Sequence, residues 1–218
     1  MNTAAPSRAH FRHTHIKLDV VGLECWRGDL QLFSELTLTT SRPVLHICGI
    51  NGSGKTTLLK VLSFLTRPEQ GTINWQQAGA SLSPREATPL ISYVGHRDGL
   101  NGVLTAAENL EWATGLHRRH RHDVVQCLQD HQLAHLARRP VAALSAGQRR
   151  RVALLRSLLS GCPVWIWDEP YANLDEAGRQ WANGLLKEHV TANGLALMTT
   201  HLQPALDSAA VQTLDLSS

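Results

Sequence analysis

The chain has 218 residues, of which 43% are hydrophobic and 18% are charged, with a formal net charge of +3 at pH 7. This length allows one ordinary core with a sub-domain attached, and no apolar run approaches the roughly 20 residues that a membrane-spanning helix needs. The mild positive charge is too weak to indicate nucleic acid as a partner, and we expect none. The scattered cysteines lack metal-ligand spacing and are typical of a reducing compartment.

The first third of the chain predicts strands. Residues 1–20 have no apolar stretch of the kind found in a secretory signal, and a frayed polar terminus is favoured over an organelle transit peptide. Short apolar or alternating runs then predict strands, and a run with helical spacing follows the third of them. The expected strands are residues 16–24, 29–39, 43–48, 71–75 and 89–94, and the expected helix is 54–65.

The middle of the chain changes to helical patterns. Thr105 and Glu108 form a capping box before one helix, and Gly161 ends another. The pattern predicts an α/β core, about residues 1–95 and 162–218 of a single domain, interrupted by a helical insert of about residues 96–161. The expected helices are 104–117, 121–133, 145–161 and 176–190, and the expected strands are 163–170, 194–200 and 210–216.

The stretch "GINGSGKTT", residues 49–57, fits the pattern of a phosphate-binding loop, hereafter the P-loop. Its glycines allow backbone N–H groups to turn toward phosphate oxygens, and the following helix directs its positive end at the same anion. Lys55 would reach the β- and γ-phosphates and Thr56 would offer a hydroxyl to Mg²⁺. A plain glycine-rich turn is the alternative, which the preceding strand and following helix disfavour. The expected nucleotide-binding residues are Gly49, Asn51, Gly52, Ser53, Gly54, Lys55, Thr56 and Thr57.

The stretch "VWIWDEP" places Asp168 and Glu169 at the end of an apolar strand. One carboxylate can hold magnesium through water, while its neighbour points elsewhere and can polarise an attacking water. A solvated acidic turn is the alternative, but the buried type of strand before the pair favours the functional interpretation. Trp165 and Trp167 share one face of this strand and are expected to pack in the core.

The stretch "LSAGQRRR", residues 144–151, predicts a second phosphate cradle. Ser145 is a good N-cap, and the N–H groups that follow it lie at a helix start. A single nucleotide does not readily need two cradles in the same chain. A head-to-tail pair of chains would use both, each lending its second cradle to the other's P-loop.

These motifs together resemble those of the ATP-binding cassette (ABC) ATPases, the motor subunits of ABC transporters. The P-loop, "LSAGQ", "WIWDEP", "ANLD" and "TTH" occur in the family's order. The resemblance implies an ABC ATPase fold, a P-loop core with an antiparallel β sub-domain and a helical sub-domain, that uses ATP and Mg²⁺, with Thr56 and Asp168 at the metal. It further implies Glu169 as general base, His201 at the γ-phosphate, and Ser145 and Gly147 gripping the nucleotide of a second copy.

Other positions leave alternatives open. The resemblance places Asp175 on the seam between two copies, but an aspartate near a helix start is also a routine N-cap, and His201 has a capping or buried role as its alternative. An aromatic residue near the start usually stacks on adenine in this family, and here either Trp26 or Arg27 would do so. His96 stands where the family normally has glutamine, in the loop that touches Mg²⁺ or attacking water and abuts the membrane partner.

One branch of the family is especially similar: the ATP-binding subunit of the haem exporter of cytochrome c maturation. The branch resembles this chain in "VGH", "LTAAENL", "LSAGQRRRVALLRSLL" and "VWIWDEP". The resemblance implies a peripheral protein at the cytoplasmic face of the bacterial inner membrane, bound to integral membrane subunits. ATP hydrolysis would drive haem delivery to a periplasmic haem chaperone; a motor for another cargo, such as a drug or lipid, is the alternative. The histidines of "LHRRHRHD" are expected to be solvated rather than haem ligands.

Overall fold

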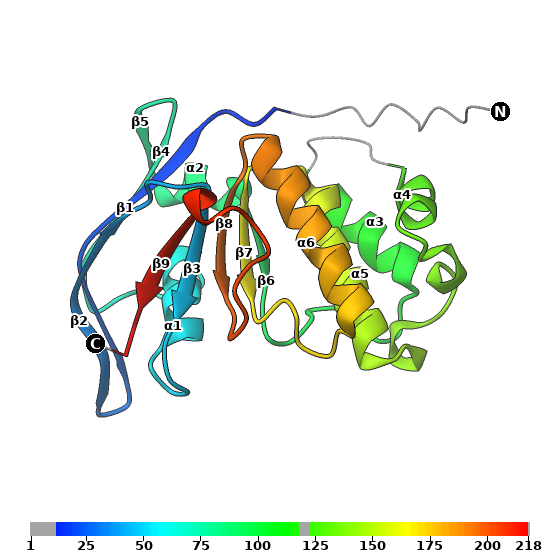
Figure 1. Ribbon diagram of the computed structural model, residues 1–218, viewed down its shortest axis with the longest axis horizontal. Helices are drawn as coiled ribbons and strands as arrows, with labels where there is room; N and C mark the ends of the chain where they lie inside the picture. Colours follow the sequence, from blue (N-terminus) through cyan, green and yellow to red (C-terminus); the bar gives the residue numbers. More distant parts are fainter. Residues whose placement is uncertain (1–11, 118–122, 218) are drawn as a thin grey trace.

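Two sheets of different character form the scaffold (Figure 1). The computed structural model describes residues 12–117 and 123–217. One sheet is antiparallel, in the order β2-β1-β4-β5, and the other is parallel, in the order β6-β7-β8-β3-β9. The antiparallel strands are β2 (Leu30–Thr39), β1 (Ile16–Arg27), β4 (Gln70–Gln77) and β5 (Ala80–Leu82), and the parallel strands are β6 (Ile91–Val94), β7 (Val164–Asp168), β8 (Leu195–Thr199), β3 (Val44–Cys48) and β9 (Val211–Asp215).

The parallel sheet is covered on both faces, which explains its apolar sequence. Every residue of β7 and β8 is buried, whereas most of β2 is exposed or half-buried. Parallel strands that are covered on both faces need continuous apolar runs, while an antiparallel sheet can leave one face to water. The predicted α/β core with an antiparallel β sub-domain is therefore confirmed, and among the described strands the short β5 was not predicted.

The helices are divided between the faces of the parallel sheet. One apolar cluster joins β1, β3, β7 and β8 with α1, between the two sheets, and a second lies under α5 and α6. A third cluster packs α3 and α4 against α5, on the side of the molecule away from the antiparallel sheet (Figure 1). The helices are α1 (Lys55–Leu62), α2 (Pro84–Ala87), α3 (Ala106–His117), α4 (Val124–Asp130), α5 (Ala146–Ser160) and α6 (Glu176–Thr191), with short 3₁₀ turns η1 (Thr88–Leu90), η2 (Ala134–Leu136), η3 (Val141–Ala143) and η4 (Ser208–Ala210).

Local capping follows the sequence closely. The Thr105 hydroxyl accepts from the Glu108 N–H at 3.2 Å while the Glu108 carboxylate accepts from the Thr105 N–H at 2.7 Å, so the predicted capping box is present. Gly161 ends α5 in the left-handed region with φ 60°, which suits a residue without a Cβ. No helix within the described residues is both long and apolar enough to cross a membrane.

The strand arrangement brings the predicted motifs to one edge. The P-loop follows β3, Asp168 ends β7, His201 follows β8 and His96 follows β6. Because parallel strands present their carboxyl ends at the same edge, segments far apart in the sequence meet there.

Candidate nucleotide-binding site

The P-loop forms a tight turn between β3 and α1. Gly49 has φ 142° and Gly54 has φ 94°, and a Cβ on Gly49 would lie 2.8 Å from the Ser53 hydroxyl. The Lys55 ammonium donates to the carbonyls of Gly49 at 2.7 Å and Ile50 at 2.9 Å, so the side chain curves back over the loop. A positive charge folded back over a glycine-rich turn at the start of α1 is a geometry suited to phosphate.

An open cavity of about 430 Å³ lies over this loop. Most of the predicted site residues meet in it, including His96, Glu169 and His201, which come from three different strand ends. Arg27 also lines it, whereas the exposed Trp26 donates its indole N–H to Glu24 at 2.8 Å. The lining is Arg27, Leu32, Asn51, Gly52, Gly54, Lys55, Thr56, Thr57, His96, Asp168, Glu169, Ala172 and His201.

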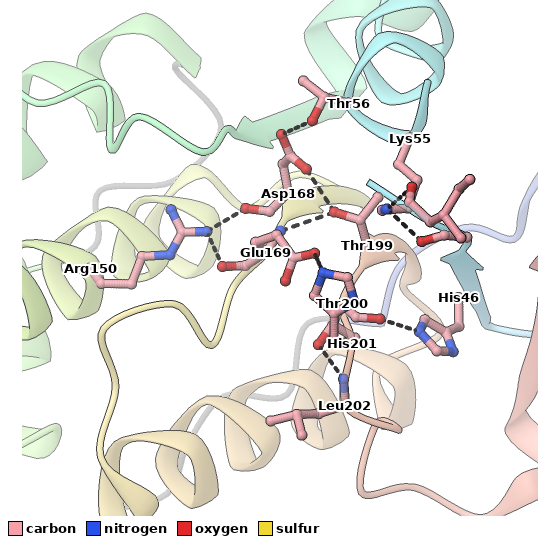
Figure 2. Close-up of polar contacts among 12 residues, drawn as sticks. His46, Lys55, Thr56, Arg150, Asp168, Glu169, Thr199, Thr200, His201 and Leu202 are labelled. Carbon is pink, nitrogen blue, oxygen red and sulfur yellow. Dashed lines mark hydrogen bonds and ion pairs between the residues drawn. The ribbon is translucent and has the colours of Figure 1, made fainter. Parts of the chain in front are cut away.

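Asp168 is buried yet fully bonded. Its Oδ2 accepts from the Thr56 hydroxyl at 2.8 Å and its Oδ1 accepts from the Thr199 hydroxyl at 2.7 Å, as Figure 2 shows. Mg²⁺ prefers oxygen ligands such as hydroxyl and carboxylate groups, and Thr56 and Asp168 present both types side by side. The residues present therefore fit a magnesium ion bound beside a nucleotide.

Glu169 follows Asp168 in a strained conformation. Its φ is 51°, in the left-handed region that side-chain-bearing residues rarely adopt. The Glu169 N–H donates to the carbonyl and to the hydroxyl of Thr199, both at 3.0 Å, which fixes this turn to β8. The carboxylate lies 3.6 Å from Nε2 of the exposed His201 (Figure 2). The strained turn thus points a carboxylate into the cavity beside an imidazole.

The loop that carries His201 is anchored from below. The buried His46 donates through Nε2 to the carbonyl of Thr200 at 2.9 Å, and the Leu202 N–H donates to the Thr200 hydroxyl at 3.0 Å. These bonds hold both sides of His201 while its ring remains exposed. His46 was not predicted, because within "VLHIC" it has the appearance of a strand residue.

A buried guanidinium lies beneath the Asp168–Glu169 turn. Arg150 of α5 is 2% exposed and donates to the carbonyl oxygens of Asp168 at 2.6 Å and Glu169 at 2.8 Å. Burial lowers the pKa of this guanidinium, and the neighbouring carboxylate of Asp98 opposes that shift. Sequence reasoning missed Arg150, because "QRRR" at the start of a helix has the appearance of a solvated charge run; it also missed the bridging role of Thr199.

The second predicted cradle starts at α5, outside the lining of the cavity. Ser145 caps the helix, since its hydroxyl accepts from the Gln148 N–H at 3.2 Å and its own N–H donates to the Gln148 amide oxygen at 3.0 Å. Gly147 packs closely against Asn173, because an added Cβ would lie 2.7 Å from the Asn173 carbonyl oxygen. Within one chain these residues do not join the P-loop group.

Asp175 serves as the N-cap of α6. Its carboxylate accepts from the Gly178 N–H at 2.8 Å and lies 3.3 Å from the Arg151 guanidinium. The backbone hydrogen bond from Gly178 holds the pKa of Asp175 below its usual range. The alternative capping role is thus present in the single chain. Within "LHRRHRHD", residues 118–122 lie outside the part of the chain that the structure describes.

Comparison with known proteins agrees with these motifs. Residues 35–172 match the sequence profile of the ABC transporter family. The chain is 41% identical to the cytochrome c biogenesis ATP-binding export protein of Nitrosococcus oceani, with 93% of each chain covered. It is 37% identical to the protein of the same name from Nitrosospira multiformis, over 92% of this chain and 98% of the relative.

Solved structures share the fold. An ABC transporter ATP-binding protein from Pyrococcus furiosus superposes with a TM-score of 0.75 at 22% identity, covering 92% of this chain and 97% of that one. An ATP-binding cassette solved as a post-hydrolysis dimer bound to ADP and phosphate superposes with a TM-score of 0.73 at 24% identity, covering 93% of this chain and 95% of that one. At these identities the likeness establishes the architecture alone.

Proposed function

The chain belongs to the ABC transporter family, among its cytochrome c biogenesis ATP-binding export proteins, and from this we propose that it is the motor subunit of a membrane complex that drives haem export or delivery in c-type cytochrome biogenesis. It is an ATPase of the transport-coupled type. The observation that carries the proposal is the meeting of Lys55, Thr56, Glu169 and His201 around one cavity. The sequence relatives supply the cargo class, which the site itself does not specify.

Each residue has a chemical role in the proposed hydrolysis. The P-loop N–H groups and Lys55 bind the phosphates, while Thr56 and Asp168 would hold Mg²⁺, which would supply positive charge beside the phosphate oxygens. Glu169 accepts the proton of the attacking water, and His201 donates a hydrogen bond to the γ-phosphate. Because phosphoryl transfer needs little covalent help, positioning and electrostatics account for most of the rate.

Arg27 is the proposed adenine contact. It lines the cavity on the side of β1, whereas Trp26 bonds to Glu24 away from it. A guanidinium plane stacks well on an aromatic base. Replacing Arg27 with alanine should raise the KM for ATP several-fold, while Trp26→Ala serves as the matched control and should leave it unchanged.

We propose that two copies close on two ATP molecules. Ser145 and Gly147 lie outside the cavity of their own chain, and a cradle at a helix start suits the nucleotide of a second copy. Asp175 would then lie on the seam while it caps α6. Ser145→Arg chains mixed with Lys55→Ala chains should form one complete site per pair and regain part of the ATPase activity that each variant lacks alone.

His96 is proposed as the contact between the γ-phosphate region and the membrane partner. It lines the cavity at the end of β6, where the neutral ring would accept a hydrogen bond from water. His96→Ala should lower ATP turnover in the complex, and His96→Gln, the residue usual in the family, should restore most of it. If His96→Ala leaves both ATP turnover and cargo release unchanged, His96 is an ordinary residue at the end of a strand and the proposed contact is wrong.

The proposed setting is the cytoplasmic face of the bacterial inner membrane, with integral membrane subunits as partners and a periplasmic haem chaperone as an indirect one. The test is to purify the complex through a tag on this chain from cells that make c-type cytochromes. We expect membrane subunits to co-purify, and ATPase activity to rise when the haem-loaded chaperone is added. If the haem-loaded chaperone leaves the ATPase activity unchanged and a drug or lipid raises it, the cargo belongs to the other class. Lys55→Ala is the inactive control.

A further inference from the structure

Arg150 connects three functional segments from a buried position in α5. Its guanidinium donates on one side to the carbonyl oxygens of Asp168 and Glu169, at 2.6 and 2.8 Å, and its Nε donates to the carbonyl of Pro170 at 3.2 Å. All three acceptors belong to the turn that carries the proposed general base, as Figure 2 shows for the first two. A planar fork of donors matches such a cluster of carbonyls in a way that a lysine ammonium cannot.

The same side chain also holds the loop that carries His96. One guanidinium nitrogen donates to the Gly95 carbonyl at 2.8 Å and to the Asp98 carboxylate at 3.2 Å. These acceptors flank His96 on both sides in the sequence. The position of the His96 loop and that of the Glu169 turn are therefore set by one rigid group.

The Glu169 turn needs such support. With φ 51°, Glu169 occupies a region that costs free energy for a residue with a side chain, and surrounding bonds must maintain it. Thr199 binds its N–H from β8, and Arg150 binds its carbonyl from α5. The second support comes from the helix that Ser145 caps, so the Glu169 backbone is tied to the helix that forms the second phosphate cradle.

We propose that Arg150 is a positioning residue that couples the phosphate cradle at the start of α5 and the His96 loop to the geometry of Glu169 in the same chain. When the nucleotide held by the P-loop of the second copy binds to Ser145, α5 shifts. This guanidinium transmits the shift to the turn that holds Glu169, the proposed general base. The inference rests on the proposed role of Glu169 in hydrolysis.

Arg156 offers a matched control. It lies on the same helix, and its guanidinium donates to the Gly99 carbonyl at 2.6 Å, so it also ties α5 to the loop after β6. Burial lowers its pKa as it does for Arg150. Among the residues that the structure describes, no hydrogen bond joins Arg156 to the turn of Asp168 and Glu169. If the only role of these arginines were to connect the helix to the loop, substituting either one should have the same effect on kcat.

The experiment compares Arg150→Lys with Arg156→Lys in the complex purified through this chain. Arg150→Lys keeps the charge but loses the fork, so kcat for ATP should fall about 30-fold to 100-fold while KM changes less than about 3-fold. Arg156→Lys should leave kcat within about 3-fold of the parent protein. A kcat for Arg150→Lys that matches Arg156→Lys would overturn the coupling.

Glu169→Gln distinguishes failure of this inference from failure of the proposed function. If Arg150 acts through Glu169, adding Arg150→Lys to Glu169→Gln should lower the residual rate by less than about 2-fold, since the two losses are not additive. Full additivity overturns the inference. A Glu169→Gln complex that hydrolyses ATP at the parent rate overturns the assignment of the base instead.

Asp98→Asn keeps the inference testable if Arg150→Lys does not fold. The Asp98 side chain is 23% exposed, so the fold should tolerate the amide, which weakens the bond to Arg150 on the side of His96 and the longer, 4.0 Å contact with Arg149. We expect kcat to fall about 3-fold to 10-fold with KM unchanged. An unchanged kcat would show that the His96 loop is not coupled to Glu169 through this guanidinium.

Discussion

Polar side chains are buried at both ends of β7, but they have different roles at the two ends. At its amino end Trp165 stacks on His189 of α6, with ring centroids 3.9 Å apart and an interplanar angle of 9°. At its carboxyl end Asp168 binds two hydroxyl groups, and Glu169 points into the cavity. One end of the strand therefore stabilises the fold, and the other holds the residues proposed for chemistry.

The two buried polar groups are accommodated in different ways. Burial, together with nearby His13, lowers the pKa of His189 to about 3, so its ring is neutral at pH 7 and packs as an aromatic plate. Asp168 is also buried, and both of its carboxylate oxygens accept hydrogen bonds from hydroxyl groups, so its polar atoms are satisfied in the interior. The comparison teaches that burial alone predicts neither stability nor function at a polar residue.

Glu169→Gln is the substitution with the largest expected effect on the carboxyl end. The amide cannot accept the proton of the attacking water, so kcat should fall about 10³-fold, equivalent to about 4 kcal/mol, and an ATP-bound dimer should accumulate. The free energy of unfolding should stay within about 0.5 kcal/mol of the parent, because the side chain lines an open cavity. Single-turnover ATPase assays measure the loss of rate, and size-exclusion chromatography with ATP detects the dimer. Urea unfolding measures the free energy of unfolding.

His189 should make stability depend on pH at the amino end. Its folded pKa of about 3 lies below the ordinary 6.5, so the unfolded chain binds the additional proton and the stabilisation is complete only above pH 6.5. The free energy of unfolding should fall as pH falls from 6.5 toward 3, by at most about 1.4 kcal/mol per pH unit.

Urea unfolding of the parent and of His189→Gln at pH 7 and pH 5 isolates this contribution. The parent should lose up to about 2 kcal/mol more than the variant between these pH values, since the variant has no ring to protonate. Equal losses in both proteins would mean that His189 is protonated in the folded state as readily as in the unfolded one.

The two tryptophans of β7 provide the smallest and most controlled test. Trp167 donates its indole N–H to the Ser157 hydroxyl at 2.9 Å, whereas the buried indole N–H of Trp165 has no hydrogen-bond partner among residues 12–117 and 123–217. Trp167→Phe should therefore lower the free energy of unfolding by about 1 kcal/mol more than Trp165→Phe, since both lose similar ring volume. Urea unfolding at pH 7 measures the difference, and a larger loss for Trp165→Phe would contradict it.

Much of the site was predictable because its motifs are local. The P-loop needs only consecutive residues, and Asp168 and Glu169 follow a strand whose apolar run is plain in "VWIWDEP". The expectation that Trp165 and Trp167 pack in the core is confirmed by their burial, at 2% and 1% exposure. The division of the chain near residues 96 and 161, and the role of each site residue in catalysis, stay predictions.

The sequence by itself determined the family, the longer strands and helices in chain order, and the residues of the P-loop, because short-range spacing carries that information. Only the tertiary structure decided that Arg150 lies under the Glu169 turn and that Trp165 stacks on His189. Those partners are separated along the chain, and their hydrogen bonds and ring contacts depend on how α5 and α6 pack against the parallel sheet. In the sequence, the charged run around Arg150 and the helical His189 resemble ordinary residues of a surface helix. Only the packing of the helices shows that both side chains are buried.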